Sequence, residues 1–554
     1  MNFPSIFSSR SGHFAVTRKQ DLKCSATQNK SNCQLISMNE KAPQKVERII
    51  GIECGYIPAA TRSVAALKEY QASQLDIAQS VMDKLKFNLN VTTLLSPSDL
   101  LNTVDSDIGL ATQQQMKTTK ELQKKLISHI AGLLSNKFSF SLKETEKVIR
   151  LEFKEAATKL RNEKTWQTVQ TRFEHNSKEY VCTLIPAGQM KSGTSNIFQH
   201  SYQNNGVCSA STTETKHATN LWMSEIAGPD DKGEAQTLFK GIRHGILSPY
   251  GLRNDDPVRA SGALSRAKEV VAAALYAKPD LFNKALAGET VPLQIVSTSL
   301  VTASQIGRED EMLKDQINAW QSLSEKKAVS LSVMGNDGKL QQVTVNLAVA
   351  AFNFGVNEMA LKFGLGRSTS DGYNEQALKQ LLGGDLTPNS PPAGMVGKYL
   401  ADTPTNGDKV RELSQQLKQI LVHNSHHRDG GEPYKAAQRV AMLAYEIGAV
   451  PCWNCKSGKD RTGMLDAEIK REVVSQHQGL PLSKPGQALS NNDKKLFQQV
   501  LVNGGNSEVQ AYNTGAAGNQ VLKKLPIFNL SYGERIGNNE VWNEVQGLSR
   551  LVRS

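Results

Sequence analysis

The feature that most constrains the fold is a strand, a tight loop and a helix that follow one another near residue 455. Apolar residues from Ile447 to Trp453 predict a short strand, and the apolar spacing further on predicts a helix that starts near Thr462. The loop between them contains Gly458 and carries Cys455 and Arg461 at its two ends. Such a turn points backbone N–H groups and the positive end of a helix dipole into one concavity. The stretch therefore predicts an anion-binding loop.

Cys455 is the predicted nucleophile of this loop. A field that holds a phosphate also lowers a thiol pKa from about 8.5 to between about 3.5 and 7.5, so a thiolate exists at neutral pH. Arg461 provides a planar fork that binds two phosphoryl oxygens, and the Thr462 hydroxyl can donate a hydrogen bond to the sulfur. The spacing of Cys455 and Arg461 alone is weak evidence. The strand, the glycine, the hydroxyl residue and the helix are independent requirements of a phosphatase loop, and the sequence meets all of them. Together they predict a cysteine-dependent phosphatase.

Two lysines, Lys456 and Lys459, flank Ser457 and Gly458 in the loop. Two cations at the edge of the pocket would suit a substrate with several phosphates, which a phosphotyrosine enzyme does not need. The alternative is that both lysines are solvated.

A general acid must protonate the leaving alkoxide, and two aspartates are candidates. Asp429 lies on a Gly-Gly loop that precedes a predicted helix (Tyr434 to Ile447), the strand and the cysteine, which is the order found in cysteine-dependent phosphatases. Asp460 lies inside the loop, directly before Arg461. We favour Asp429, although either residue could be an ordinary loop acid.

Four stretches resemble one known family, the SopB/SigD/IpgD effectors, and more distantly the mammalian inositol polyphosphate 4-phosphatases. The similarity runs from about Trp166 to the C-terminus, and the stretches are Asn454–Met464, Phe352–Glu358, Gly241–Tyr250 and His426–Tyr434. Arg243 and His244, in the third of these stretches, are either a further phosphate contact or a structural pair. Many cysteine phosphatases have histidine before the nucleophile, whereas Asn454 stands here, as it does in the resembling family.

The resemblance implies a type III secreted virulence effector that dephosphorylates phosphoinositides and inositol polyphosphates. It also implies an uncleaved secretion signal in residues 1–33, a secretion chaperone, and a host small GTPase of the Cdc42 type as partners. The site of action would be the host cytosol and the cytoplasmic membrane face, by peripheral association. Because a phosphocysteine can be intercepted by another hydroxyl, transfer of phosphate between inositol positions is chemically possible.

The positive net charge of the chain favours anionic partners but does not indicate which kind. The formal net charge is +12 over 554 residues, but no nucleic-acid-binding motif is visible and only 6% of residues are aromatic, so nucleic acid is not favoured. The seven cysteines are scattered, which indicates reduced thiols in a cytosolic setting. No run of eighteen apolar residues could span a bilayer.

Periodicity divides the chain into a helical module, residues 34–165, and a mixed α/β catalytic domain, residues 166–554. Three helices are predicted over 61–85, 113–134 and 141–160, the last with a capping box of Ser141 and Glu144 and an apolar face that ends at Leu160. The module is either a structural cap or a partner-binding surface. Further on, residues 336–338 predict a hairpin turn, and residues 383–397 predict a long loop. The predicted fold class is thus α+β or α/β.

We expect no cofactor and no metal, because the cysteine mechanism needs neither. His423, His426 and His427 could form a metal cluster, but a polar loop near Asp429 is the favoured interpretation. Two other functions remain open: a dual-specificity protein phosphatase, which the lysine pair disfavours, and a protein that acts chiefly by binding a GTPase.

Overall fold

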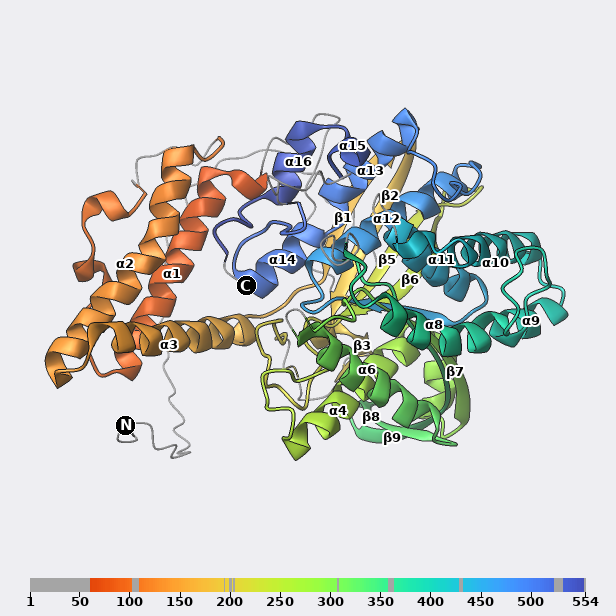
Figure 1. Ribbon diagram of the computed structural model, residues 1–554, viewed down its shortest axis with the longest axis horizontal. Helices are drawn as coiled ribbons and strands as arrows, with labels where there is room; N and C mark the ends of the chain where they lie inside the picture. The colour runs from red at the N-terminus through yellow and green to blue at the C-terminus, as the bar shows by residue number, and fades with distance from the viewer. Residues whose placement is uncertain are drawn as a thin grey trace. The chain divides into compact units, whose positions relative to one another are not determined.

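A mixed β-sheet of eight described strands lies at the centre of the region that was predicted to be mixed α/β (Figure 1). The computed structural model describes residues 60–101, 109–193, 195–198, 202, 205–305, 308–356, 363–427, 432–522 and 532–552. The strand order across the sheet is β1-β2-β5-β6-β10-β7-β9-β8, and a separate small ribbon pairs β3 with β4. The strands are β1 Val169–His175, β2 Lys178–Pro186, β3 Lys191–Ser192, β4 Ser195–Asn196, β5 Trp222–Pro229, β6 Ala235–His244, β7 Thr290–Ser299, β8 Val329–Met334, β9 Leu340–Asn353 and β10 Val450–Asn454.

β10 occupies an inner position of the sheet and runs parallel to both neighbours, β6 and β7. β7 also runs parallel to β9, whereas β1, β2, β5 and β6 pair antiparallel, as do β8 and β9. The carboxyl ends of β6, β7, β9 and β10 therefore meet at one edge, which is the edge where open α/β sheets bind ligands. Three of the sequence stretches singled out above begin at or near these strand ends, which is why the fold brings them together.

Helices cover both faces of the sheet, because alternate side chains of a strand point to opposite sides. Val450 and Cys452 of β10 pack in an apolar cluster with α4, α5 and α6, whereas Trp453 packs in a second cluster with α8 and α10 to α13. The predicted mixed α/β class is confirmed. The helices are α4 Pro257–Tyr276, α5 Pro279–Leu286, α6 Glu309–Ser324, α8 Arg367–Leu382, α9 Gly394–Ala401, α10 Gly407–Val422, η6 Ser425–His427, α11 Glu432–Glu446, α12 Asp460–His477, α13 Asn491–Asn503, α14 Asn506–Thr514, α15 Tyr532–Ile536 and α16 Asn539–Gln546.

The three predicted N-terminal helices are confirmed as α1 (Val64–Lys84), α2 (Gln113–Phe138) and α3 (Leu142–Glu163), which share one apolar core (Figure 1). The predicted capping box is wrong, because the Ser141 side chain accepts no hydrogen bond from the start of α3. Leu160 is 39% exposed, so the predicted apolar face ends earlier. The reason is that the last turn of α3 leaves the three-helix core, where Arg161 Nη2 donates to the Thr514 carbonyl (3.0 Å).

The C-terminal end of the chain contacts the first of these helices and the residues just before it. Tyr70 donates to the Leu551 carbonyl (3.3 Å), and the Thr61 N–H donates to Glu544 Oε1 (3.0 Å). Lys45–Ser554 accordingly forms one compact unit. The domain boundary at residue 165 stays a prediction, and the expected secretion segment 1–33 lies outside the described residues.

Two predicted connections can be compared with the structure. The turn at residues 336–338 joins β8 to β9 as an antiparallel hairpin, with Gly338 at φ +74°, so this prediction is confirmed. The loop predicted over 383–397 is too long, because Gly394 begins α9. Among the helices that the structure describes, none is long and apolar enough to cross a membrane.

Candidate active site

Cys455 follows β10 directly, at the start of a loop that ends where α12 begins at Asp460. The predicted order of strand, loop and helix is confirmed, with the helix starting slightly before Thr462. Asn454 fixes the base of the loop from two sides. Its carbonyl accepts a hydrogen bond from the Leu300 N–H (2.7 Å), and its side-chain oxygen accepts one from Gln316 Nε2 (2.8 Å).

Carbonyl oxygens of the loop are bonded to other segments of the chain. Three donors outside the loop bind three consecutive carbonyls: Ile246 N–H to Lys456 (3.1 Å), Asn220 Nδ2 to Ser457 (3.0 Å) and Arg243 Nη2 to Gly458 (3.4 Å). Within the described part of the chain, the N–H groups of Lys456, Ser457 and Lys459 donate to no protein acceptor. Unbonded N–H groups in a strand-loop-helix turn can bind an anion, and the anion-binding role of the loop stays a prediction.

Gly458 is required by the shape of the loop. Its φ of +66° lies in the left-handed region, and a Cβ there would stand 2.6 Å from the carbonyl group of His244. Any side chain would therefore push the loop away from the end of β6.

The Cys455 thiol is buried, with 2% of the residue exposed, yet its pKa is lowered. Burial alone would raise the pKa, but the positive charge of Arg461 and the nearby Thr462 hydroxyl and backbone N–H outweigh it. The Thr462 hydroxyl is buried and has no hydrogen-bond partner among the described residues, so it is free to turn toward the sulfur. In contrast, burial raises the pKa of Cys452, three residues earlier. Of these two thiols, only Cys455 has the lowered pKa that a nucleophilic thiol needs.

Arg461 is oriented by Glu309, the first residue of α6 and one that the sequence analysis missed. Arg461 Nη2 contacts Glu309 Oε1 at 2.9 Å, and Nη1 donates to the Leu300 carbonyl (2.8 Å). Glu309 is itself held by the Thr302 N–H (2.9 Å). Burial would lower the pKa of Arg461, but the Glu309 carboxylate outweighs burial and raises it, so the guanidinium stays charged. Arg461 Nε has no acceptor among the described residues and remains available to a phosphoryl oxygen.

The two loop lysines differ in their surroundings. Lys459 is buried and pairs with Asp460 at 2.7 Å. Lys456 is partly exposed, and its Nζ lies 4.8 Å from the ring centroid of Tyr250. The other Asp460 oxygen accepts the Gln520 N–H (3.1 Å). Lys456 is thus the loop cation that is free to reach a substrate, whereas the charge of Lys459 is already balanced.

Arg243 and His244, proposed from the sequence as substrate contacts, are both completely buried at the end of β6. The Arg243 guanidinium contacts Asp466 (3.6 Å) and Asn506 (2.5 Å) as well as the loop carbonyl already described. Burial lowers the pKa of His244 to about 4, so this imidazole is neutral at physiological pH. The surroundings of both residues therefore favour a structural pair over a phosphate contact.

The remaining predicted residues lie beyond β9. Asp429, the favoured acid, lies outside the described residues. His426 and His427 come together on η6, whereas His423 is exposed on the preceding helix end and its Nδ1 contacts the Gln419 carbonyl (2.8 Å).

Comparison with known proteins identifies the family. The family model described as enterobacterial virulence protein IpgD matches residues 44–552. The chain belongs to the IpgD family. This match includes the loop between β10 and α12, the ends of β6 and β9, and the helices α1 to α3.

Two named proteins illustrate this IpgD family relationship. The chain is 46% identical over 538 residues to inositol phosphate phosphatase SopB of Salmonella typhimurium, covering 94% of this chain and 95% of SopB. It is 43% identical over 450 residues to inositol phosphate phosphatase IpgD of Shigella flexneri, covering 80% and 83%. A solved Legionella phosphoinositide phosphatase has the same fold, with a TM-score of 0.60 at 11% identity over 89% of this chain and 91% of that chain.

The second stretch that resembles the IpgD family begins at the end of β9 and surrounds Asn353. The Asn353 side chain donates to the carbonyls of Val301 (2.7 Å) and Ser299 (3.2 Å), so it ties β9 to the segment after β7. That segment also provides Leu300, the partner of Arg461. The geometry agrees with a packing and pocket-shaping role for this stretch.

The first prediction concerns the thiol. Because the pKa of Cys455 is lowered, its thiolate should persist as pH falls below the pKa of about 8.5 of an ordinary thiol, and should be lost only as pH falls through the lower native value. The measurement is the thiolate ultraviolet absorbance against pH, as the difference between wild type and Cys455→Ser. Unfolded protein is the control, in which the titration should return to the ordinary value; the same midpoint in both states would contradict the prediction.

Proposed function

We propose that this chain is a phosphoinositide and inositol polyphosphate phosphatase that works through a phosphocysteine at Cys455. The observation that carries the proposal is one thiol with a lowered pKa, at the mouth of a loop with free N–H groups and beside a buried arginine fork. The names of SopB and IpgD support the substrate class.

The proposed reaction has two steps. Cys455 Sγ attacks phosphorus, the P–O bond to the inositol ring breaks, and the leaving oxygen takes a proton from the general acid. Water then attacks the phosphocysteine, gives its proton to the same residue, and releases phosphate and the thiolate. The loop N–H groups and Arg461 stabilise the charge that develops in both steps. If a ring hydroxyl attacks in place of water, the phosphate moves to another inositol position.

The surroundings of the loop favour a substrate with several phosphates. Lys456 is partly exposed beside Tyr250, and the whole chain carries a formal charge of +12. A dual-specificity protein phosphatase would use the same nucleophile and loop, so substrate preference has to be measured.

The test is phosphate release by wild-type protein from vesicles with single phosphoinositides, from soluble inositol polyphosphates and from a phosphotyrosine peptide. Cys455→Ser protein is the control for contaminating activity. Release from the inositol substrates is expected. Release from the peptide alone would move the chain to the protein phosphatase alternative.

A second prediction separates the candidate acids. Because the Asp460 carboxylate is already bound by Lys459 and by the Gln520 N–H, Asp429 stays the favoured acid. Asp429→Asn should lower kcat on an inositol phosphate by about 10²- to 10⁴-fold, and much less on an aryl phosphate whose leaving group needs no proton. Asp460→Asn should affect both substrates alike. A selective loss in Asp460→Asn instead would reverse the assignment.

We further propose that α1 to α3 bind a host small GTPase of the Cdc42 type, and that the chain reaches the host cytosol through a type III system with the help of a chaperone. Support for the binding surface comes from exposed apolar side chains on α2 and α3, among them Leu151 (64% exposed) and Phe138 (41% exposed). The family resemblance supports the rest.

The third prediction tests this surface. Leu151→Asp should weaken GTPase binding at least about tenfold, because a charge there removes apolar contact, and should leave phosphatase activity unchanged. Binding is measured by titration calorimetry. Leu340→Asp is the matched control, because Leu340 is 50% exposed at the β8–β9 hairpin. Equal binding by wild type and Leu151→Asp would place the GTPase contact elsewhere.

A further inference from the structure

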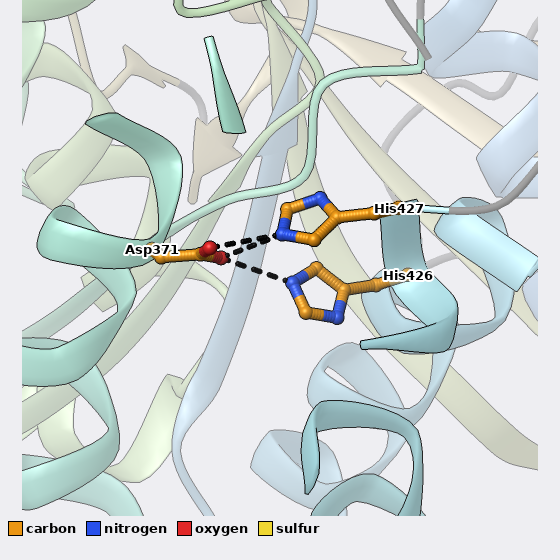
Figure 2. A group of neighbouring side chains, drawn as sticks. All are labelled: Asp371, His426 and His427. Atoms are coloured by element: carbon orange, nitrogen blue, oxygen red, sulfur yellow. Dashed lines mark hydrogen bonds and ion pairs between the residues drawn. The ribbon is translucent and has the colours of Figure 1, made fainter. Parts of the chain in front are cut away.

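A compact cluster of three possible metal ligands lies on η6 and α8, outside the anion-binding loop. Asp371 from α8 faces His426 and His427 from η6, and both imidazoles point one ring nitrogen at its carboxylate (Figure 2). We propose that Asp371, His426 and His427 form a site for a divalent metal ion of the zinc type. The sequence predicted a polar loop at these histidines. Asp371 lies 55 residues before His426, and only the fold brings it to them.

The distances fit a metal that would enter between these atoms. His427 Nε2 lies 2.9 and 3.0 Å from the two Asp371 oxygens, and His426 Nε2 lies 3.2 Å from one of them. All three ligand atoms lie within 4.8 Å of one another. Zinc binds nitrogen and oxygen at about 2.0–2.2 Å, so the donors of a tetrahedral site are about 3.3 Å apart. Only small side-chain shifts separate the observed cluster from that geometry.

The donor set also matches zinc in chemical type. Two imidazoles and one carboxylate are common ligands of Zn²⁺, and three protein ligands leave a fourth position for water or an anion. The competing interpretation is a hydrogen-bonded cluster in which each neutral imidazole donates Nε2–H to the carboxylate. The two interpretations differ in one property: only the metal site binds Zn²⁺ with a fixed stoichiometry that all three side chains determine.

The ligands are held by their surroundings, as a preformed site requires. His426 is 4% exposed and packs edge-on against Phe354 from the end of β9, and the two imidazole centroids are 3.9 Å apart. Arg367 Nη2 donates to the His427 carbonyl (3.1 Å). Both histidines are therefore fixed by contacts that do not involve Asp371.

An entry path exists on the α8 side. The Asp371 side chain is 46% exposed, and it lines an open pocket of about 490 Å³ together with His427 and His423. A hydrated ion can reach the carboxylate through this pocket, and the fourth ligand has room there. Bound metal would add a link between α8 and η6, which already meet here through hydrogen bonds to the Asp371 carboxylate and through the bond from Arg367 to the His427 carbonyl.

The test is direct Zn²⁺ binding to full-length, tag-free protein carrying Cys455→Ser, so that the reactive thiolate does not contribute. Equilibrium dialysis with elemental analysis should give one Zn²⁺ per chain. Asp371→Asn and His427→Gln should each weaken binding at least about tenfold, because each removes one of three ligands. His423→Gln is the matched control, since His423 lines the same pocket but contacts the Gln419 carbonyl, and it should bind as the parent does.

Two further readouts keep the test independent of activity and of folding. Zn²⁺ should raise the melting temperature of the parent and of His423→Gln but not of Asp371→Asn, with all variants first shown to be folded by circular dichroism. Co²⁺ used as the probe should give the intense visible absorption of a tetrahedral site only where all three ligands remain. No stoichiometric binding by the parent, or binding that survives Asp371→Asn and His427→Gln, would overturn the proposal.

Discussion

Cys455→Ser is expected to reduce phosphate release from inositol substrates by about 10⁴-fold or more, the scale on which loss of a covalent nucleophile affects catalysis. The charge of Arg461 and the neighbouring Thr462 lower the pKa of this thiol despite its burial. A serine hydroxyl in the same field stays protonated, because its ordinary pKa lies far above that of a thiol. The loop N–H groups remain, so the variant should still bind substrate. The measurement is kcat and substrate affinity side by side, with acid-quenched protein analysed for covalent phosphate.

The matched control is Cys452→Ala, which removes the neighbouring thiol of β10. Cys452 is 1% exposed, its pKa is raised by burial, and it faces the opposite side of the sheet from Trp453. This variant should keep its activity and lose only about 1 kcal/mol of stability. Activity retained in Cys455→Ser would remove the covalent mechanism, and activity lost equally in Cys452→Ala would indicate a structural role for the whole strand.

Local parts of the fold were predictable because their signals are local. The strand, loop and helix around Cys455, and the helices α1 to α3, follow from apolar periodicity and glycine placement within short windows. The errors also have local causes. A capping box at Ser141 was consistent with sequence but does not form, and α9 begins inside a stretch whose prolines and glycines indicated a loop.

The support of the loop could not be predicted, because it comes from distant segments. Glu309 precedes Arg461 by 152 residues, and Asn220 precedes Ser457 by 237, and neither spacing carries a signal in one sequence. The role of other residues depends on how deeply the fold buries them, which one sequence does not show. From the sequence, Arg243 could be a phosphate contact or a structural residue, and its complete burial against Asp466 favours the structural role.

Arg461→Lys should lower kcat by about 10³-fold, which is a typical loss when a charged contact to the transition state is removed. Lysine keeps the positive charge but not the fork, so it cannot contact Glu309 and two phosphoryl oxygens at once. The charge that lowers the pKa of Cys455 is retained, so the thiolate titration should stay near that of wild type. Arg461→Met removes both properties and should move the titration to higher pH as well.

Together, Arg461→Lys and Arg461→Met separate the contribution of the positive charge from that of the planar guanidinium group. A surface arginine in the neighbouring segment, Arg308, is the matched control, because its side chain is 66% exposed and Arg308→Lys should change neither kcat nor the titration. Glu309→Gln should lower kcat about tenfold through the loss of orientation, with little change in substrate affinity, which identifies it as a positioning residue. If Arg461→Lys kept full activity, the charge alone would suffice, and the planar contact with Glu309 would serve stability rather than catalysis.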